Sequence, residues 1–133
     1  MLRISGAYLD VKAMLLENPL PVEQMWVKGE PRILRGKFHV NSGVSVVVSD
    51  AEFDEFDLQA ADAAQFLQLH HAAMLKIAAY PAVEEVSLDF GVAIREGYAT
   101  QSSYLSPQLM QLAASAGVGI LLSHYPCSDS DES

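Results

Sequence analysis

The chain has 133 residues and a mass of 14.5 kDa, the size of one domain, and a chain of this mass can bury about two thirds of its unfolded surface. Its formal charge of −9, from 17 acidic and 8 basic side chains, disfavours binding to nucleic-acid phosphates. No apolar run approaches the ~20 residues that a membrane helix needs, and the N-terminus lacks the pattern of a signal peptide. With a single cysteine, Cys127, the sequence therefore predicts one cytoplasmic domain over residues 1–125 and a disordered acidic tail over residues 126–133.

Hydrophobic periodicity and turn residues predict three helices and six strands in the order β-α-β-β-β-α-β-α-β. In chain order we expect a strand at 2–8, a helix at 11–17, two short strands within 25–41, a strand at 43–49, a helix at 58–79, a strand at 86–95, a helix at 107–116 and a strand at 118–125. The strands alternate apolar and polar side chains, which is typical of a sheet with one covered face. We expect an α+β fold of ferredoxin-like character, with a mostly antiparallel or mixed sheet and helices packed on one face.

Capping residues indicate where each predicted helix begins and ends. Asp10 precedes the first helix, and Asp57 is the expected N-cap of the longest one. Ser106 and Pro107 open the last helix, and Gly117 follows it at the position where a left-handed residue commonly ends a helix. These short-range signals depend on neighbouring residues alone.

The titratable side chains do not form a recognisable catalytic or metal-binding pattern. His70 and His71 are adjacent on the predicted helix and point about 100° apart, which is wrong for sharing one ion. We interpret His70 as a buried residue that hydrogen bonds to a neighbouring element. Cys127 follows Pro126 among tail carboxylates that disfavour its thiolate. We therefore expect no enzyme activity, no cofactor and no metal.

Asp89 lies in the sequence "LDFG", which has the letters of a kinase magnesium motif. The letters fall in the middle of a predicted strand, in a chain too short for a kinase, so we interpret the match as coincidence. A carboxylate on the polar face of a central strand needs a partner. We expect Arg95 or an arginine of residues 25–37 to pair with Asp89, and a general-base role is the alternative.

Half of the basic side chains lie in the stretch "MWVKGEPRILRGK", residues 25–37. Trp26 close to Lys28 and Arg32 suits an anionic ligand, and together with Asp89 these residues form our candidate ligand-binding set. The alternative is structural: Trp26 packs at the edge of the sheet, and the cations balance the acidic residues of 50–57.

An acidic run follows the predicted strand at 43–49 and is the candidate surface for a basic protein partner. Its carboxylates are Glu52, Asp54, Glu55 and Asp57. We expect no nucleic-acid or membrane partner. A homodimer is an open alternative, in which the small side chains Ser87, Gly91 and Ala93 on the polar face of the sheet pair with a second copy.

Several of these motifs together resemble a known family. They are a strand ending near Gly6, an aspartate-capped helix, Leu20-Pro21, the residues Trp26, Lys28, Gly29 and Glu30, the pattern Gln59, Asp62, Ala63, Phe66 and Leu67, and "LDFG". The chain resembles, over about residues 2–125, a small uncharacterised bacterial domain family, a domain of unknown function with a W-x-K-G-E motif. The resemblance implies no activity and no catalytic residue.

Small acidic stand-alone bacterial domains often serve as immunity proteins that block a toxin, which is an argument from analogy. We interpret the chain as a non-enzymatic protein-interaction domain that binds a basic partner, and an immunity-type protein is one form that this analogy suggests. The alternative is a domain that binds a small anionic ligand.

Overall fold

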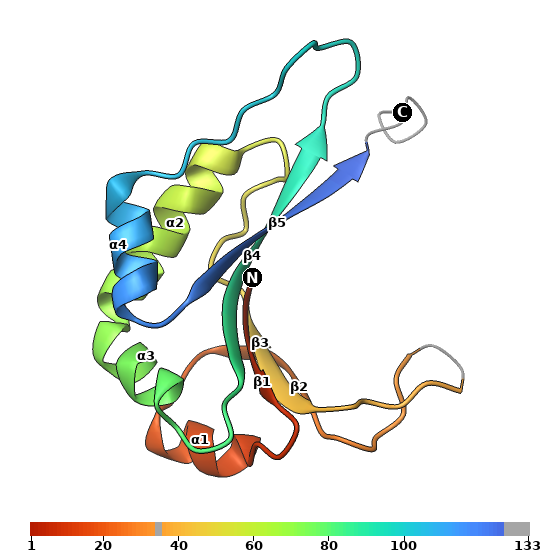
Figure 1. Cartoon of the computed structure of the whole chain (residues 1–133), viewed down its shortest axis with the longest axis vertical. Helices are drawn as coiled ribbons and strands as arrows, with labels where there is room; N and C mark the ends of the chain where they lie inside the picture. Colours follow the sequence, from red (N-terminus) through yellow and green to blue (C-terminus); the bar gives the residue numbers. More distant parts are fainter. Residues whose placement is uncertain (34–35, 127–133) are drawn as a thin grey trace.

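The computed structural model describes residues 1–33 and 36–126 and shows one five-stranded sheet with helices on one of its faces (Figure 1). The strands are β1 (Leu2–Gly6), β2 (Val22–Trp26), β3 (Ser42–Val46), β4 (Glu85–Ile94) and β5 (Gly119–Pro126), and the helices are α1 (Val11–Glu17), α2 (Phe56–Leu69), α3 (His71–Ala78) and α4 (Pro107–Ser115). The strand order is β2-β3-β1-β4-β5, with β4 and β5 parallel and the other neighbours antiparallel. The predicted α+β class with a mixed sheet is confirmed.

The first four strands have ferredoxin-like connectivity. They follow the order β-α-β-β-α-β along the chain, with α2 and α3 together in the place of the second helix, and they lie in the sheet as β2-β3-β1-β4. The helix α4 then leads to β5, which adds a parallel strand next to β4. The structure is therefore a ferredoxin-like unit extended by one helix and one edge strand.

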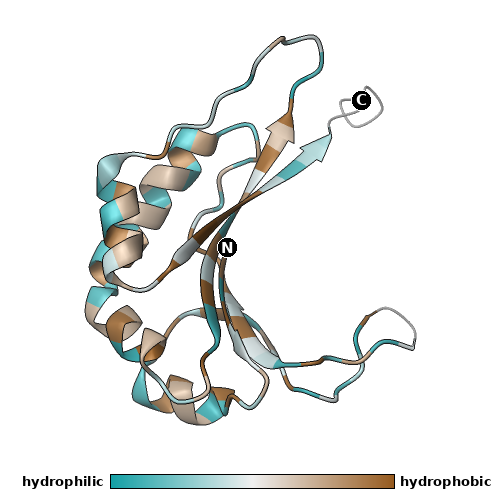
Figure 2. Cartoon of the chain, in the orientation of Figure 1, coloured by the Kyte–Doolittle hydropathy of each residue, from teal (hydrophilic) through white to brown (hydrophobic). Residues whose placement is uncertain are grey.

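The hydrophobic core lies between the sheet and the helices, and Figure 2 shows apolar residues along the strands and on helices that also carry polar residues. The largest fully buried side chains come from both layers: Leu2, Ile4, Met14, Val44, Val46, Leu67, Met74, Ile77, Leu88, Phe90 and Leu109. In β1 and β4, alternate residues are buried on the helix side, as the period of two in the sequence predicts. No helix of the described residues is long and apolar enough to cross a membrane.

The longest predicted helix is broken in the structure. It divides at His70 into α2 and α3, because His70 has φ −105° and ψ 21° and leaves the helical conformation. The predicted burial of His70 is wrong, because its side chain is only partly buried. The centre of its ring lies 4.4 Å from the centre of the Phe66 ring. The N-cap of α2 is Glu55 rather than Asp57, which lies in the first turn, where its charge still favours the helix dipole.

The predicted return strand at 38–40 is not a strand. Phe38 forms a single isolated bridge with Pro31, and His39 exchanges backbone hydrogen bonds with the turn at Gly29 and Glu30. Pro126 ends β5, so it belongs to the sheet rather than to the predicted tail. The rest of that tail and Cys127 lie outside the described residues.

Candidate functional site

The sheet has one face that no helix of residues 1–33 and 36–126 covers, here called the open face (Figure 1). In β1, Leu2 and Ile4 point to the core, so Arg3 and Ser5 point to the open face. The strand register extends this face across the sheet, through Gln24, Trp26, Gly43, Ser45, Ser87, Asp89, Gly91, Leu121, Ser123 and Tyr125. Polar and small side chains thus occupy its centre, and aromatic side chains lie at both ends.

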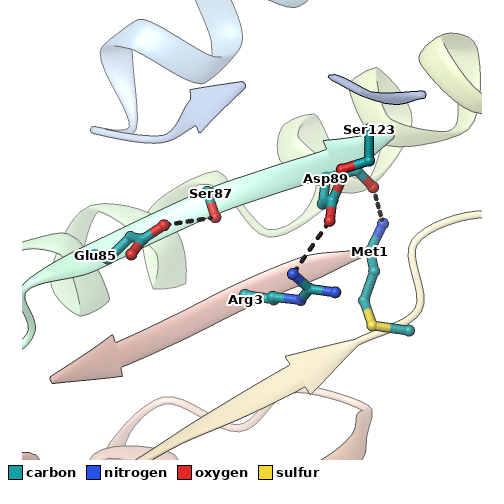
Figure 3. A network of polar contacts seen from close by, with 6 residues as sticks. All are labelled: Met1, Arg3, Glu85, Ser87, Asp89 and Ser123. Atoms are coloured by element: carbon teal, nitrogen blue, oxygen red, sulfur yellow. Dashed lines mark hydrogen bonds and ion pairs between the residues drawn. The ribbon is translucent and has the colours of Figure 1, made fainter. Parts of the chain in front are cut away.

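Asp89 is the centre of a polar network on the open face (Figure 3). One carboxylate oxygen pairs with the Arg3 guanidinium at 3.1 Å, and the other accepts a hydrogen bond from the Ser123 hydroxyl at 2.6 Å. The Met1 amine donates to the backbone oxygen of Asp89 at 2.7 Å, and burial lowers the pKa of this amine. Both carboxylate oxygens are thus engaged, the Asp89 side chain is only 9 % exposed, and the network links β1, β4 and β5.

Asp89 pairs with an arginine, as expected, but the arginine that we expected is wrong. Arg3 takes the place that we assigned to Arg95 or to an arginine of residues 25–37. The reason is the strand order: β1 lies next to β4, and Arg3 is diagonal to Asp89 across that pair.

The ligand-binding residues predicted from sequence do not come together. Trp26 and Arg32 line a hollow of about 410 Å³ at the end of β2. Lys28 instead places its ammonium 4.3 Å from the centre of the Tyr8 ring, and Asp89 is three strand spacings from Trp26, about 14 Å across the sheet. Only half of the predicted set therefore shares one hollow.

The W-x-K-G-E residues build a turn at the end of the β2–β3 hairpin. The Trp26 ring lies over Gly43, where a Cβ would be 2.5 Å from the ring, and its indole nitrogen donates to Asn41 at 2.9 Å. Gly29 has φ +89°, and the Glu30 amide closes the turn on the carbonyl of Val27. These contacts give the motif a structural role.

The acidic run forms one wall of a pocket of about 350 Å³, here called the acidic pocket. Its lining residues are Phe53, Asp54, Glu55, Phe56, Asp57, Val92, Ala93, Arg95, Tyr98, Thr100, Gln101, Ser102 and Ser103. Three of the four carboxylates predicted to bind a partner line it, and the fourth, Glu52, is exposed beside it. The structure thus brings the predicted acidic residues together on one surface.

Two glutamine side chains hold the walls of the acidic pocket in place. Gln59 of α2 donates from its amide nitrogen to the carbonyls of Glu52, at 3.0 Å, and Gly91, at 2.9 Å. Gln101 donates to the carbonyl of Ala93 at 2.7 Å and accepts from the Arg95 amide at 2.8 Å. Both walls are therefore tied to the same strand, β4.

The preceding segment is held by another residue of the same helix. Asp62 accepts a 2.6 Å hydrogen bond from the Ser49 hydroxyl, which in turn accepts from the amide of Ala51. Phe53 then accepts a backbone hydrogen bond from Ala93 and stacks on Tyr125, with ring centres 5.2 Å apart. Gln59 and Asp62, noted in the sequence as motif residues, thus position the acidic run.

The second wall of the acidic pocket, residues 95–103, was not predicted as part of a site. The sequence "REGYATQSS" has no hydrophobic period and no known motif, so the only available signal was the density of small polar residues after a strand. Tyr98 of this wall is 67 % exposed and brings an aromatic ring beside the carboxylates.

The structure describes no group of three or more histidine, cysteine or acidic side chains placed to hold a metal ion in residues 1–33 and 36–126. Comparisons with family models, curated proteins and solved structures found no match for the chain. The resemblance to the W-x-K-G-E family stays a prediction.

Proposed function

We propose that this chain is a protein-interaction domain that binds a basic segment of a partner protein in the acidic pocket. The observation that carries the proposal is the combination of three carboxylates with exposed aromatic rings on two walls that are both tied to β4. The carboxylates of Asp54, Glu55 and Asp57 outweigh the cation Arg95, which also lines the pocket. Phe53 and Tyr98 supply large apolar surfaces beside these charges.

This combination fits a lysine- or arginine-rich segment for two reasons. Carboxylates attract the cations over a distance and increase the rate of encounter. Aromatic rings accept the aliphatic stems and the charged heads of such side chains by packing and by cation–π contact. Tyrosine and phenylalanine are also among the side chains enriched at the centres of protein interfaces.

An immunity-type role, in which the domain blocks a basic toxin in the cytoplasm, is the specific form of this proposal that the analogy with small acidic bacterial domains suggests. It is supported by the acidic surface, in which Asp54, Glu55 and Asp57 line one pocket. A toxin gene next to the gene for this chain would be the expected genetic context. Binding between the two purified products would then test the role directly.

The direct test is the binding of a fluorescent oligolysine peptide, measured by anisotropy, with an oligoglutamate peptide as the negative probe. We expect the triple variant Asp54→Asn, Glu55→Gln, Asp57→Asn to lose most of the affinity. The control neutralises Glu17, Glu23 and Glu30 with glutamine, which changes the net charge equally but leaves the acidic pocket intact. Equal losses in the two triple variants would show only a general charge effect and would contradict the proposal.

A second candidate function is the binding of a small anionic ligand at the hollow of Trp26 and Arg32. The observation in its favour is the hollow itself, about 410 Å³, which His39 and Met25 also line. A ligand at 100 times its dissociation constant stabilises the fold by about 2.7 kcal/mol, so a thermal-shift screen of carboxylates and phosphates would detect it. Any stabilisation should disappear in Arg32→Gln; a shift that survives this change would place the ligand elsewhere.

A further inference from the structure

A long uncharged stretch lies in this otherwise acidic chain. Residues 97–126 contain no aspartate, glutamate, lysine or arginine, although 19 % of the whole chain is charged. At that average, a stretch of this length would carry five or six charges. An absence of charge over such a length needs a physical explanation.

The uncharged stretch supplies one edge of the sheet and the helix beside it. It includes the edge strand β5 and the helix α4, which packs against β5 and α2. Figure 1 shows both elements on the side of the molecule nearest the viewer. Large apolar side chains of this side are half exposed, namely Met110, Leu121 and Tyr125. Depletion of charge together with exposed apolar and aromatic groups is the composition of an interface core.

The two edges of the sheet differ in how they resist pairing with another strand. The β2 edge carries Glu23 and has an irregular register between Val22 and Gln24, both of which hinder an added strand. The β5 edge pairs with β4 without interruption from Gly119 to Pro126 and carries no charge. Edges that lack charges, bulges and internal proline are the ones that pair.

We propose that the β5 edge and α4 form a homodimer interface, in which β5 pairs antiparallel with β5 of a second copy. The charge distribution selects a second copy as the occupant. Two molecules that each carry a formal charge of −9 repel one another least where they carry no charge, whereas a basic partner would find nothing to attract it there.

The symmetry of the fold suits this pairing. A two-fold axis perpendicular to the sheet, passing beside the middle of β5, joins the two sheets into one continuous sheet. The same axis leaves the helices of both copies on one face, so that α4 meets its counterpart beside the paired strands. Leu121, which is 48 % exposed on the open face, then lies close to the second copy.

The test compares the mass in solution of the full chain and of two leucine variants by sedimentation velocity, at protein concentrations from about 1 to about 100 µM. We expect the wild-type chain to reach twice 14.5 kDa and Leu121→Glu to stay at the monomer mass. The matched control is Leu69→Glu, which places the same charge at a leucine that is 77 % exposed on α2, and it should dimerise like the wild type.

Hydrogen exchange on the wild-type chain gives a second measurement that does not depend on how well a variant folds. Amides of β5 should become more protected as the protein concentration rises, while those of β2, the other edge, should not change. A wild-type monomer at the highest concentration, equal masses for the two variants, or equal protection changes in both edges would each overturn the proposal. The oligolysine assay reads the loss of the carboxylates Asp54, Glu55 and Asp57, which belong to neither β5 nor α4, so the two proposals can fail separately.

Discussion

Gln59 is a buried polar side chain whose importance is visible only in the structure. It is 6 % exposed and satisfies two backbone carbonyls, those of Glu52 and Gly91. We expect Gln59→Leu to lower the free energy of unfolding by about 2 kcal/mol, because it removes the donor to two carbonyls beside the core. Urea denaturation measures the loss, and the oligolysine affinity should fall with it, since the acidic run loses its anchor.

The control for Gln59 is on the same helix. Gln65 is exposed on α2, so Gln65→Leu makes the same chemical change without removing a buried donor. Its stability should stay within about 0.5 kcal/mol of the wild type. If both variants lost the same stability, the two hydrogen bonds of Gln59 would not be the cause.

Gly91 is a second residue whose identity is explained by what lies over it. A Cβ at this position would be 2.6 Å from the Phe53 ring, so Gly91→Ala should displace that ring from Tyr125. We expect a loss of about 1 to 3 kcal/mol from this overpacking, measured by thermal or urea unfolding. Gly119→Ala is the control on the neighbouring strand, because its nearest contact would be an ordinary 3.8 Å. If Gly91→Ala kept the stability of the wild type while Gly119→Ala lost stability, this account would be contradicted.

At the scale of single elements, helix boundaries could be predicted where the signals are local. For α4, Ser106 accepts a hydrogen bond from the Leu109 amide at 3.1 Å, Pro107 is the first residue, and Gly117 has φ +72°. All these positions were predicted from sequence because a cap depends on residues within one turn. The break at His70 was missed, since neither proline nor glycine marks it.

The cap of α4 leads to a prediction about stability. Ser106→Ala should lower the free energy of unfolding by about 1 kcal/mol, because the Leu109 amide loses its acceptor at the start of the helix. Ser102→Ala, in the exposed loop before the helix, is the matched control. Chemical denaturation of both variants measures the difference, and no difference would mean that water replaces the cap at no cost.

The pairing of strands could not be predicted in the same way. Alternation along β1 and β4 indicates which side chains face the core, but it does not say which strands are neighbours. Arg3 was therefore overlooked as the partner of Asp89, because their contact depends on β1 lying beside β4. The acidic pocket could not be predicted for the same reason. Its carboxylates were visible in the sequence, but only the tertiary fold brings the wall at 95–103 to them.

At the scale of the whole molecule, the charges are separated by region. The loop with Lys28, Arg32 and Lys37 leaves the sheet at the end of β2, the acidic run precedes α2, and the two lie at different ends of the molecule (Figure 1). No ion pair joins them within the residues that the structure describes. The expectation that these cations balance the acidic run therefore finds no support in the contacts, while α4 and β5 form a third, uncharged region.

This separation predicts that salt acts in opposite directions on the two proposed interactions. Raising the ionic strength from about 0.01 M to about 0.15 M shortens the Debye length from about 30 Å to about 8 Å. The attraction between the acidic pocket and oligolysine is then screened, and the association rate should fall by about tenfold or more. Self-association through the uncharged β5 edge should instead strengthen, because salt screens the repulsion between two copies of charge −9. Anisotropy and sedimentation over one salt series measure both trends. If salt weakened both interactions, the copies would be joined by attraction between charges, and the dimer interface would have to include the basic loop or the acidic run.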